Sequence, residues 1–315
     1  MVKRIILFEF FVIFLILLAG CSTDSNVKSE GESEKRVIHI GYVPTTHAAP
    51  LFLQNEKQYE NYEMELVAYG TWPELMDALN TGRIDGASVL TPLAMMAKEK
   101  GIDLKAVARS HRDGNVFIVS PEIHSLEDLK GKTIAIPSSL STQNVLLYQL
   151  LKQNGIDDEE LNIISLSPAD MSAALVQGQI AGYIVAEPVG AISVILEKGK
   201  VLYSSQDIWK NAIDSSLVLQ HRFIEENREL AKQFVQDYAK AGEVTQKKDE
   251  HVHKVISQYI DVDDEVLDLL LQWISYDNVM IEEEAYNILV DSLKEMGLTE
   301  SPSSYEEFVD ISLLE

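Results

Sequence analysis

An internal repeat constrains this chain more than any other feature of its sequence. Residues 71–93 (TWPELMDALNTGRIDGASVLTPL) align without a gap on residues 167–189 (SPADMSAALVQGQIAGYIVAEPV), 96 positions later. Seven aligned pairs are identical: Ala78/Ala174, Leu79/Leu175, Gly82/Gly178, Ile84/Ile180, Gly86/Gly182, Val89/Val185 and Pro92/Pro188. Two related units within 315 residues predict two similar lobes.

Each copy has the pattern of a helix, a turn, a buried strand and a stop. Thr71 and Ser167 stand where an N-cap is expected, and an acidic residue follows each of them three positions later. Gly82 and Gly178 stand where a left-handed residue ends a helix. A short apolar run then leads to a proline in both copies, so each predicts one helix followed by one strand.

A second similarity precedes each copy. Residues 40–46 (IGYVPTT) are echoed by residues 133–139 (TIAIPSS), 93 positions later. Both segments predict a buried strand that ends in a proline and two hydroxyl residues, with a helix after it. Strands that alternate with helices predict an α/β fold, in which helices cover both faces of parallel-rich sheets.

The chain is expected to pass between the two lobes twice. Residues 116–119 (VFIV) are typical of a strand that ends near 120, and residues 217–219 (LVL) of a strand that returns. Beyond residue 221 the pattern is almost entirely helical, and we expect these helices to pack on the first lobe. The predicted ranges are therefore 37–120 plus 218–315 for lobe 1 and 121–217 for lobe 2. Two crossings predict a two-segment hinge beside a cleft that can close on a small molecule.

The first residues predict an export signal. Lys3 and Arg4 precede an apolar run over residues 5–18, which is shorter than the roughly 20 residues of a membrane-spanning helix. Residues 1–20 are therefore predicted to be a signal peptide. The run ends in Leu-Ala-Gly-Cys at residues 18–21, which resembles the bacterial lipobox. The resemblance implies lipidation of Cys21, a tether over residues 21–36, and an extracytoplasmic protein anchored to the bacterial cell membrane.

Composition excludes several classes of protein. With 50 acidic and 26 basic residues, the formal charge is -24, and we expect no nucleic-acid partner. A single cysteine excludes a disulfide framework and a Cys-rich metal site. His251 and His253 fall on different faces of a helix, and the acidic run 261–265 lacks the glycine and glutamate of a calcium loop. The sequence therefore predicts no metal and no cofactor.

Candidate ligand-binding residues follow from the repeated strand ends. Ligands of open parallel sheets bind beyond the carboxyl ends of the strands, where hydroxyl groups and helix N-termini can hold an anion. Trp72 at a helix start can stack on a ligand or donate its N–H. Glu187 favours a ligand with a donor or cationic group, or a bridge to Lys210. The predicted set is Thr45, Thr46, His47, Trp72, Thr91, Asn115, Ser138, Ser139, Thr142, Gln143 and Glu187, and the family resemblance given below adds Lys210.

Several motifs together carry a family resemblance. They are GYVP (41–44), HAAPL (47–51), WPEL (72–75), GRIDGA (82–87), TPL (91–93) and EP (187–188). Over about residues 37–225 the chain resembles the nitrate/sulfonate/taurine/bicarbonate family of ABC-transporter substrate-binding proteins. The resemblance implies a two-lobed type II periplasmic-binding-protein-like fold and delivery of a solute to ABC permease subunits.

The resemblance also bears on the solute. Trp72, Glu187 and Lys210 resemble a pocket tryptophan, a glutamate and an anion-facing lysine of the nitrate and bicarbonate receptors. Gln143 and Val189 stand where those receptors tend to have His and Trp. The solute therefore stays open among a small oxyanion, a sulfonate and a small heterocycle.

Two other functions use the same fold. One is a sensory ligand-binding module, and the other is an enzyme that acts on a pyrimidine-like substrate. The sequence contains no G-x-S-x-G, H-E-x-x-H, P-loop or G-x-G-x-x-G motif. We therefore expect a solute receptor and not an enzyme.

Overall fold

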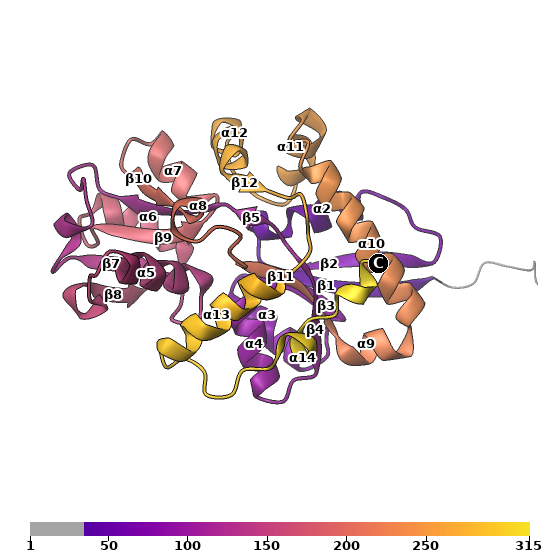
Figure 1. Ribbon diagram of the computed structural model, residues 1–315. Helices are drawn as coiled ribbons and strands as arrows, with labels where there is room; N and C mark the ends of the chain where they lie inside the picture. Colours follow the sequence, from indigo (N-terminus) through magenta and orange to yellow (C-terminus); the bar gives the residue numbers. More distant parts are fainter. Residues whose placement is uncertain (1–34) are drawn as a thin grey trace, which may run out of the picture. The chain divides into compact units, whose positions relative to one another are not determined.

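The computed structural model describes residues 35–315, and these form an α/β fold with two five-stranded sheets and flanking helices (Figure 1). The predicted fold class is confirmed. The predicted signal peptide, Cys21 and nearly all of the predicted tether lie outside the described residues. Within residues 35–315, no helix combines the length and the apolar character that crossing a membrane requires.

The first sheet has the strand order β2-β1-β3-β11-β4. Its strands are β1 (Arg36–Tyr42), β2 (Tyr62–Ala68), β3 (Gly86–Leu90), β4 (Leu104–Arg109) and β11 (Ser215–Gln220). Strand β1 runs parallel to β2 and β3, whereas β11 is antiparallel to both β3 and β4. The sheet is therefore parallel except for β11.

The second sheet has the strand order β10-β6-β9-β7-β8. Its strands are β6 (Asn115–Val119), β7 (Thr133–Ile136), β8 (Asn162–Ser165), β9 (Gly182–Ala186) and β10 (Lys200–Ser204). Strand β7 is parallel to β8 and β9, whereas β6 is antiparallel to β9 and β10. In both sheets the antiparallel strand is thus the one that arrives from the other sheet.

The two crossings follow from this strand pairing. The chain leaves the first sheet at residues 110–114, where β5 (Arg112–Asp113) pairs with β12 (Ile274–Ser275), and it returns over residues 205–214. The predicted boundary at residue 120 would assign β6 to the first lobe, but β6 pairs in the second sheet. An apolar run such as VFIV predicts a strand without specifying which sheet the strand joins. The lobe ranges themselves stay a prediction.

Helices cover both faces of the first sheet. Along β11, Leu217 and Leu219 pack with one buried cluster and Val218 packs with another, as the alternation of a strand requires. The helices with residues in the cluster of Leu217 include α2 (Ala49–Asn55), α9 (His221–Glu226), α10 (Arg228–Thr245), α11 (Glu250–Ile256) and α12 (Asp264–Trp273). Those in the cluster of Val218 include α3 (Trp72–Asn80), α4 (Thr91–Glu99), α5 (Thr142–Gln153), α13 (Glu283–Glu295) and α14 (Tyr305–Phe308).

The remaining helices are on chain segments that connect the strands or follow the last of them. The α-helices are α6 (Pro168–Val176), α7 (Val189–Ile195) and α8 (Ser205–Ile208). The single turns of 3-10 helix are η1 (Thr46–Ala48), η2 (Glu127–Leu129), η3 (Asp158–Glu160) and η4 (Ile311–Leu313).

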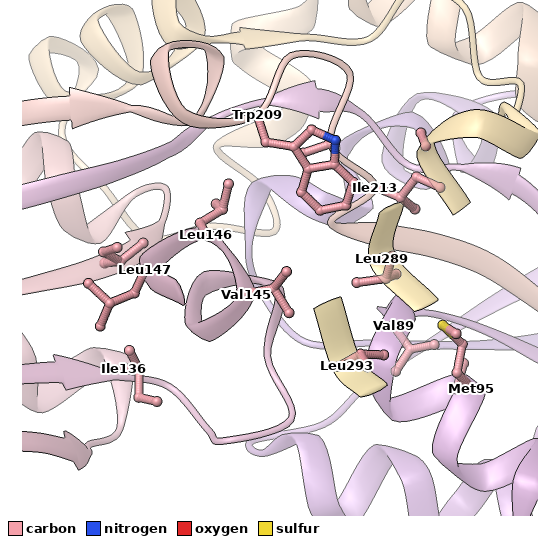
Figure 2. Close-up of a cluster of buried hydrophobic side chains, with 14 of the residues drawn as sticks. Val89, Met95, Ile136, Val145, Leu146, Leu147, Trp209, Ile213, Leu289 and Leu293 are labelled. Carbon is pink, nitrogen blue, oxygen red and sulfur yellow. The ribbon is translucent and has the colours of Figure 1, made fainter. Parts of the chain in front are cut away.

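The C-terminal helices join the two sheets. Helix α10 packs against α2 beside the first sheet, as predicted, but α12 also contacts α7, and α13 also contacts α5. Gln149 of α5 donates to the Ser292 hydroxyl of α13 at 2.7 Å. Figure 2 shows Leu146 and Leu147 of α5 in one buried cluster with Leu289 and Leu293 of α13. These helices are therefore shared between the sheets and do not belong to the first lobe alone.

The structure contains the repeat as it was predicted. Helix α3 and strand β3 span residues 72–80 and 86–90, and α6 and β9 span the residues 96 positions later. The φ angles of Gly82 and Gly178 are 71° and 67°, so both glycines have the expected left-handed conformation. The Thr71 hydroxyl accepts the Glu74 N–H at 3.3 Å, whereas Ser167 caps α6 without a side-chain hydrogen bond.

A second pair of repeat glycines allows the crossing strands to approach closely. A Cβ atom on Gly86 would lie 2.5 Å from the carbonyl oxygen of Val218 on β11. A Cβ atom on Gly182 would lie 2.7 Å from the carbonyl oxygen of Ile118 on β6. Both copies therefore begin their strand with glycine because a backbone carbonyl of the antiparallel neighbour occupies that space.

We predict that Gly86→Ala and Gly182→Ala each lower the free energy of unfolding by about 1–3 kcal/mol, because the backbone must shift to admit a methyl group. Urea unfolding followed by circular dichroism measures the change. Gly70→Ala is the control, since its Cβ would meet only the Glu74 carboxylate, at 3.4 Å. Equal stability of all three variants would contradict the close approach.

Candidate functional site

A cavity of about 570 Å³ is lined by residues from the ends of strands in both sheets. On the side of the first sheet the lining residues are Val43, Pro44, Thr45, His47, Gly70, Thr71, Trp72, Pro73 and Leu90. On the side of the second sheet they are Pro137, Gln143, Ser167, Pro168, Ala169, Val185, Ala186, Pro188 and Val189. The cavity thus lies at the carboxyl ends of β1, β3, β7 and β9, where ligands of open α/β sheets bind.

Equivalent positions of the repeat line opposite sides of the cavity. Residues 71–73 before and within α3 correspond to residues 167–169 before and within α6, and all six line it. Pro44 after β1 and Pro137 after β7 correspond in the same way. The N-termini of two related helices therefore meet at one cavity.

Four of the predicted ligand-binding residues line the cavity: Thr45, His47, Trp72 and Gln143. Trp72 is half-buried, and its ring centroid lies 5.9 Å from that of His47. The Gln143 amide donates to Asn115 Oδ1 at 2.6 Å, so Asn115 lies behind the lining as support. These side chains offer one indole, one imidazole, one amide and one hydroxyl to a ligand.

Three predicted hydroxyl residues are buried in contacts within the protein. Thr46 donates to the carbonyl of Glu187 at 3.2 Å, and Thr142 donates to the carbonyl of Asp214 at 3.0 Å. Thr91 shares a hydrogen bond of 2.9 Å with the hydroxyl of Ser216. These hydroxyl groups join chain segments that are distant in sequence and are absent from the cavity lining.

Three further predicted residues lie away from the cavity lining. The Ser138 hydroxyl accepts the N–H of Leu140 at 3.2 Å, and Ser139 is exposed. Lys210 is exposed as well, and within residues 35–315 it forms no ion pair with Glu187. The sequence placed these residues near a strand or helix end but could not give the direction of their side chains.

The carboxyl group of Glu187 holds the start of α7. Glu187 is fully buried, and its Oε2 accepts the N–H of Ala191 at 2.9 Å. Burial raises the pKa of Glu187 to about 8, although the Ala191 N–H opposes that shift. Its neighbours Pro188 and Val189 line the cavity, so Glu187 fixes the backbone that forms the cavity wall.

Two buried histidines and one buried aspartate meet beside the cavity. His47 Nδ1 lies 2.6 Å from His111 Nε2, and these atoms lie 3.4 and 3.6 Å from Asp214 Oδ2. Burial lowers the pKa of both histidines to about 3 and raises the pKa of Asp214. We refer to these three residues as the His–His–Asp cluster.

The sequence identified only His47 of this cluster. His111 follows β4 on the first crossing, and Asp214 precedes β11 on the second, so no sequence spacing relates them. The one signal available was their position, since His111 comes two residues after β4 and Asp214 directly precedes β11.

We predict that Glu187→Gln changes how stability depends on pH. The folded state holds the carboxyl proton more tightly than the unfolded chain does, because the pKa rises from 4.5 to about 8. The contribution of this carboxyl group to stability should therefore fall as pH rises through this range, by up to about 1.4 kcal/mol per pH unit. Urea unfolding between pH 5 and 8 should show a smaller decline for Glu187→Gln.

Glu60→Gln, at an exposed glutamate, is the matched control and should keep the wild-type slope. Parallel slopes for wild type and Glu187→Gln would show that the buried carboxyl group does not retain its proton.

Comparison with known proteins shows that the chain is similar to components of import systems. Residues 31–260 match the model of the NMT1-like family. The nitrate import ATP-binding protein NrtC of Synechocystis sp. is 28% identical over 215 residues, which cover 61% of this chain and 32% of that protein. The chain thus spans about a third of that relative's length.

Two further proteins match over most of their length. The putative aliphatic sulfonates-binding protein of Escherichia coli is 25% identical over 245 residues, which cover 76% of each protein. The ligand binding component of an ABC-type import system from Staphylococcus aureus, solved with zinc bound, is 36% identical. Its structure superimposes with a TM-score of 0.83 and covers 89% of this chain and 98% of that chain.

These matches, together with the nitrate/nitrite binding protein NrtA of Nostoc sp., which is 25% identical over 215 residues (60% of this chain and 49% of that protein), confirm the predicted resemblance to nitrate- and sulfonate-binding proteins of ABC transporters. Because the family model covers well over half of the sequence, the chain belongs to the NMT1-like family.

Proposed function

We propose that this chain is an extracytoplasmic solute-binding protein, which captures a small organic molecule in the cavity and delivers it to an ABC permease. One observation carries the proposal: equivalent residues of the two repeat copies line a single cavity. A solute in the cavity contacts residues from both sheets at once. Its binding energy can therefore favour an arrangement in which the two sheets close around it. The similarity to a sulfonate-binding protein and to an import-system component supports the same role.

The size and lining of the cavity favour an organic solute over a bare oxyanion. A volume of about 570 Å³ falls within the range of about 300–1,000 Å³ that holds drug-sized ligands, and it far exceeds a nitrate or bicarbonate ion. Among the described lining residues none is Lys, Arg, Asp or Glu, and most are apolar. The N-termini of α3 and α6 favour negative charge. We therefore propose a solute with an apolar body and a small anionic head, such as a sulfonate.

Closure about the two crossings is part of the proposal. Asp113, Gly114 and Asn211 have φ angles of 65°, 75° and 64°, and they lie on the two segments that connect the sheets. Hinge motion concentrates in a few such residues between packed elements. We propose that residues 110–114 and 205–214 form the two segments of the hinge.

A thermal-shift screen tests the proposed function. Wild-type protein is heated with alkanesulfonates, nitrate, bicarbonate and pyrimidine heterocycles, because a ligand at 100 times its Kd adds about 2.7 kcal/mol of stability. We expect sulfonates to stabilise the chain and to be recovered chemically unchanged. For the best ligand, Trp72→Ala should raise the Kd roughly 5- to 150-fold in calorimetry, because stacking area and one N–H donor are lost.

Lys210→Ala is the matched control, since Lys210 is exposed and absent from the cavity lining; its Kd should equal that of wild type. Wild-type affinity in Trp72→Ala would place the solute elsewhere. Stabilisation by none of the four ligand classes would contradict the receptor proposal, and turnover of the solute would favour the enzyme alternative.

We also propose that Cys21 anchors the protein to the cell membrane through a lipid. The support is the Leu-Ala-Gly-Cys segment after a short apolar run, in which Cys21 is the single cysteine of the chain. A solute receptor held at the membrane by a tether stays near its permease.

Metabolic labelling with a fatty-acid analogue should mark the wild-type protein, and Cys21→Ser should abolish the label because the acceptor thiol is gone. Ser22→Ala, next to the proposed acceptor, is the control and should keep the label. Equal labelling of wild type and Cys21→Ser would refute the lipid anchor.

A further inference from the structure

The His–His–Asp cluster brings three metal-binding atoms together from three separate segments. His47 lies on η1, His111 on the first crossing and Asp214 on the second. Their atoms His47 Nδ1, His111 Nε2 and Asp214 Oδ2 are separated by 2.6, 3.4 and 3.6 Å. All three side chains are buried, with exposed fractions of 2% for each residue.

The spacing of these atoms suits a small divalent ion. The point equidistant from all three lies about 1.9 Å from each, as the three separations require. Zinc binds imidazole nitrogen and carboxylate oxygen at about 2.0–2.2 Å, so an ion would sit about 1 Å or less from the plane of the three atoms. The two imidazole rings face each other through these nitrogens, with their centroids 4.8 Å apart. On binding an ion the nitrogens would part by about 0.7 Å and the rings would turn toward the ion to reach tetrahedral angles.

Neighbouring groups hold His111 and Asp214 in place through hydrogen bonds. His111 Nδ1 lies 3.0 Å from the carbonyl oxygen of Asp113, and donation to that oxygen makes Nε2 the acceptor of the 2.6 Å hydrogen bond from His47 Nδ1, which a bound ion would replace. Asp214 Oδ2 accepts from Asn115 at 2.8 Å, and Asp214 Oδ1 accepts from Gln143 at 3.3 Å. Histidines bonded to a carbonyl, and carboxylates held by amides, are the usual outer shell of metal ligands.

The charge of the cluster also calls for a cation. Within residues 35–315, Asp214 pairs with His47 and His111 and with no Lys or Arg. Hydrogen bonds from neutral amides and imidazoles offset only part of the desolvation of a buried carboxylate. A divalent ion would supply the missing positive charge within coordination distance.

We propose that His47, His111 and Asp214 bind a divalent transition-metal ion, for which zinc matches the donor set best. Three protein ligands leave a fourth tetrahedral position for water or a solute atom. Two neutral imidazoles and one carboxylate around a divalent ion leave a net charge of +1. Because His47 lines the cavity, that charge adjoins a lining without Lys or Arg and favours an anionic head group, a consequence that rests on the proposed function.

The experiment measures metal binding without any solute. Purified chain is stripped with a chelator and titrated with Zn²⁺ in a calorimeter, and Co²⁺ is added separately for its visible spectrum. We expect one Zn²⁺ per chain and the intense absorption of tetrahedral Co²⁺. Asp214→Asn and His111→Ala should each weaken Zn²⁺ binding by about 100-fold or more and remove the tetrahedral Co²⁺ signal.

His221→Ala is the matched control. His221 Nδ1 lies 2.9 Å from Asp103 Oδ2 in a partly exposed pair, so adventitious surface binding would depend on it, whereas the proposed site would not. Circular dichroism checks that the variants fold. X-ray absorption of zinc-loaded wild type should detect two imidazole ligands, a readout that needs no variant.

The proposal is overturned if wild type takes up no stoichiometric Zn²⁺, or if its zinc has no imidazole ligands. Zn²⁺ binding that survives in Asp214→Asn but disappears in His221→Ala overturns it as well. None of these measurements involves a solute. A negative result would therefore rule out the metal site without deciding the proposed receptor function, which the thermal-shift screen tests separately.

Discussion

The buried carboxyl group of Asp214 connects the parts of the molecule that form the cavity. It accepts hydrogen bonds from Asn115 on β6 and Gln143 on α5, and it lies within 3.6 Å of His47 and His111. One side chain before β11 therefore ties the return crossing to both sheets. Separating these groups would leave buried polar atoms without hydrogen-bond partners, which costs free energy. The network therefore favours the observed arrangement of the strand ends around the cavity.

The repeat explains why the cavity has matching sides. Each copy supplies a helix that begins at the cavity and a strand that ends there, and each strand begins with a glycine against the antiparallel strand of its sheet. The two copies differ at positions that line the cavity: Trp72 in the first copy corresponds to Pro168 in the second. A duplicated scaffold thus carries a pocket whose two halves can bind different parts of one solute.

Sequence patterns predicted what depends on local periodicity and missed what depends on long-range contact. The bounds of α3, β3, α6 and β9 follow the repeat, and Gly82 and Gly178 have the expected conformation. The sheet joined by β6, the bridging role of α12 and α13, and the meeting of His111 with Asp214 depend on tertiary packing. Lys210 was chosen by position in a resemblance, and position alone did not indicate that its side chain is exposed.

His111 and Asp214 belong to the same two segments on which Asp113, Gly114 and Asn211 have left-handed backbone angles. In the proposed hinge, one sheet would rotate against the other about these connections, and atoms close to a pivot are displaced least. The cavity walls at residues 71–73 and 167–169 lie on separate sheets and would separate most. In the proposed hinge motion, the distance between His111 and Asp214 would therefore change less than the distance between the cavity walls.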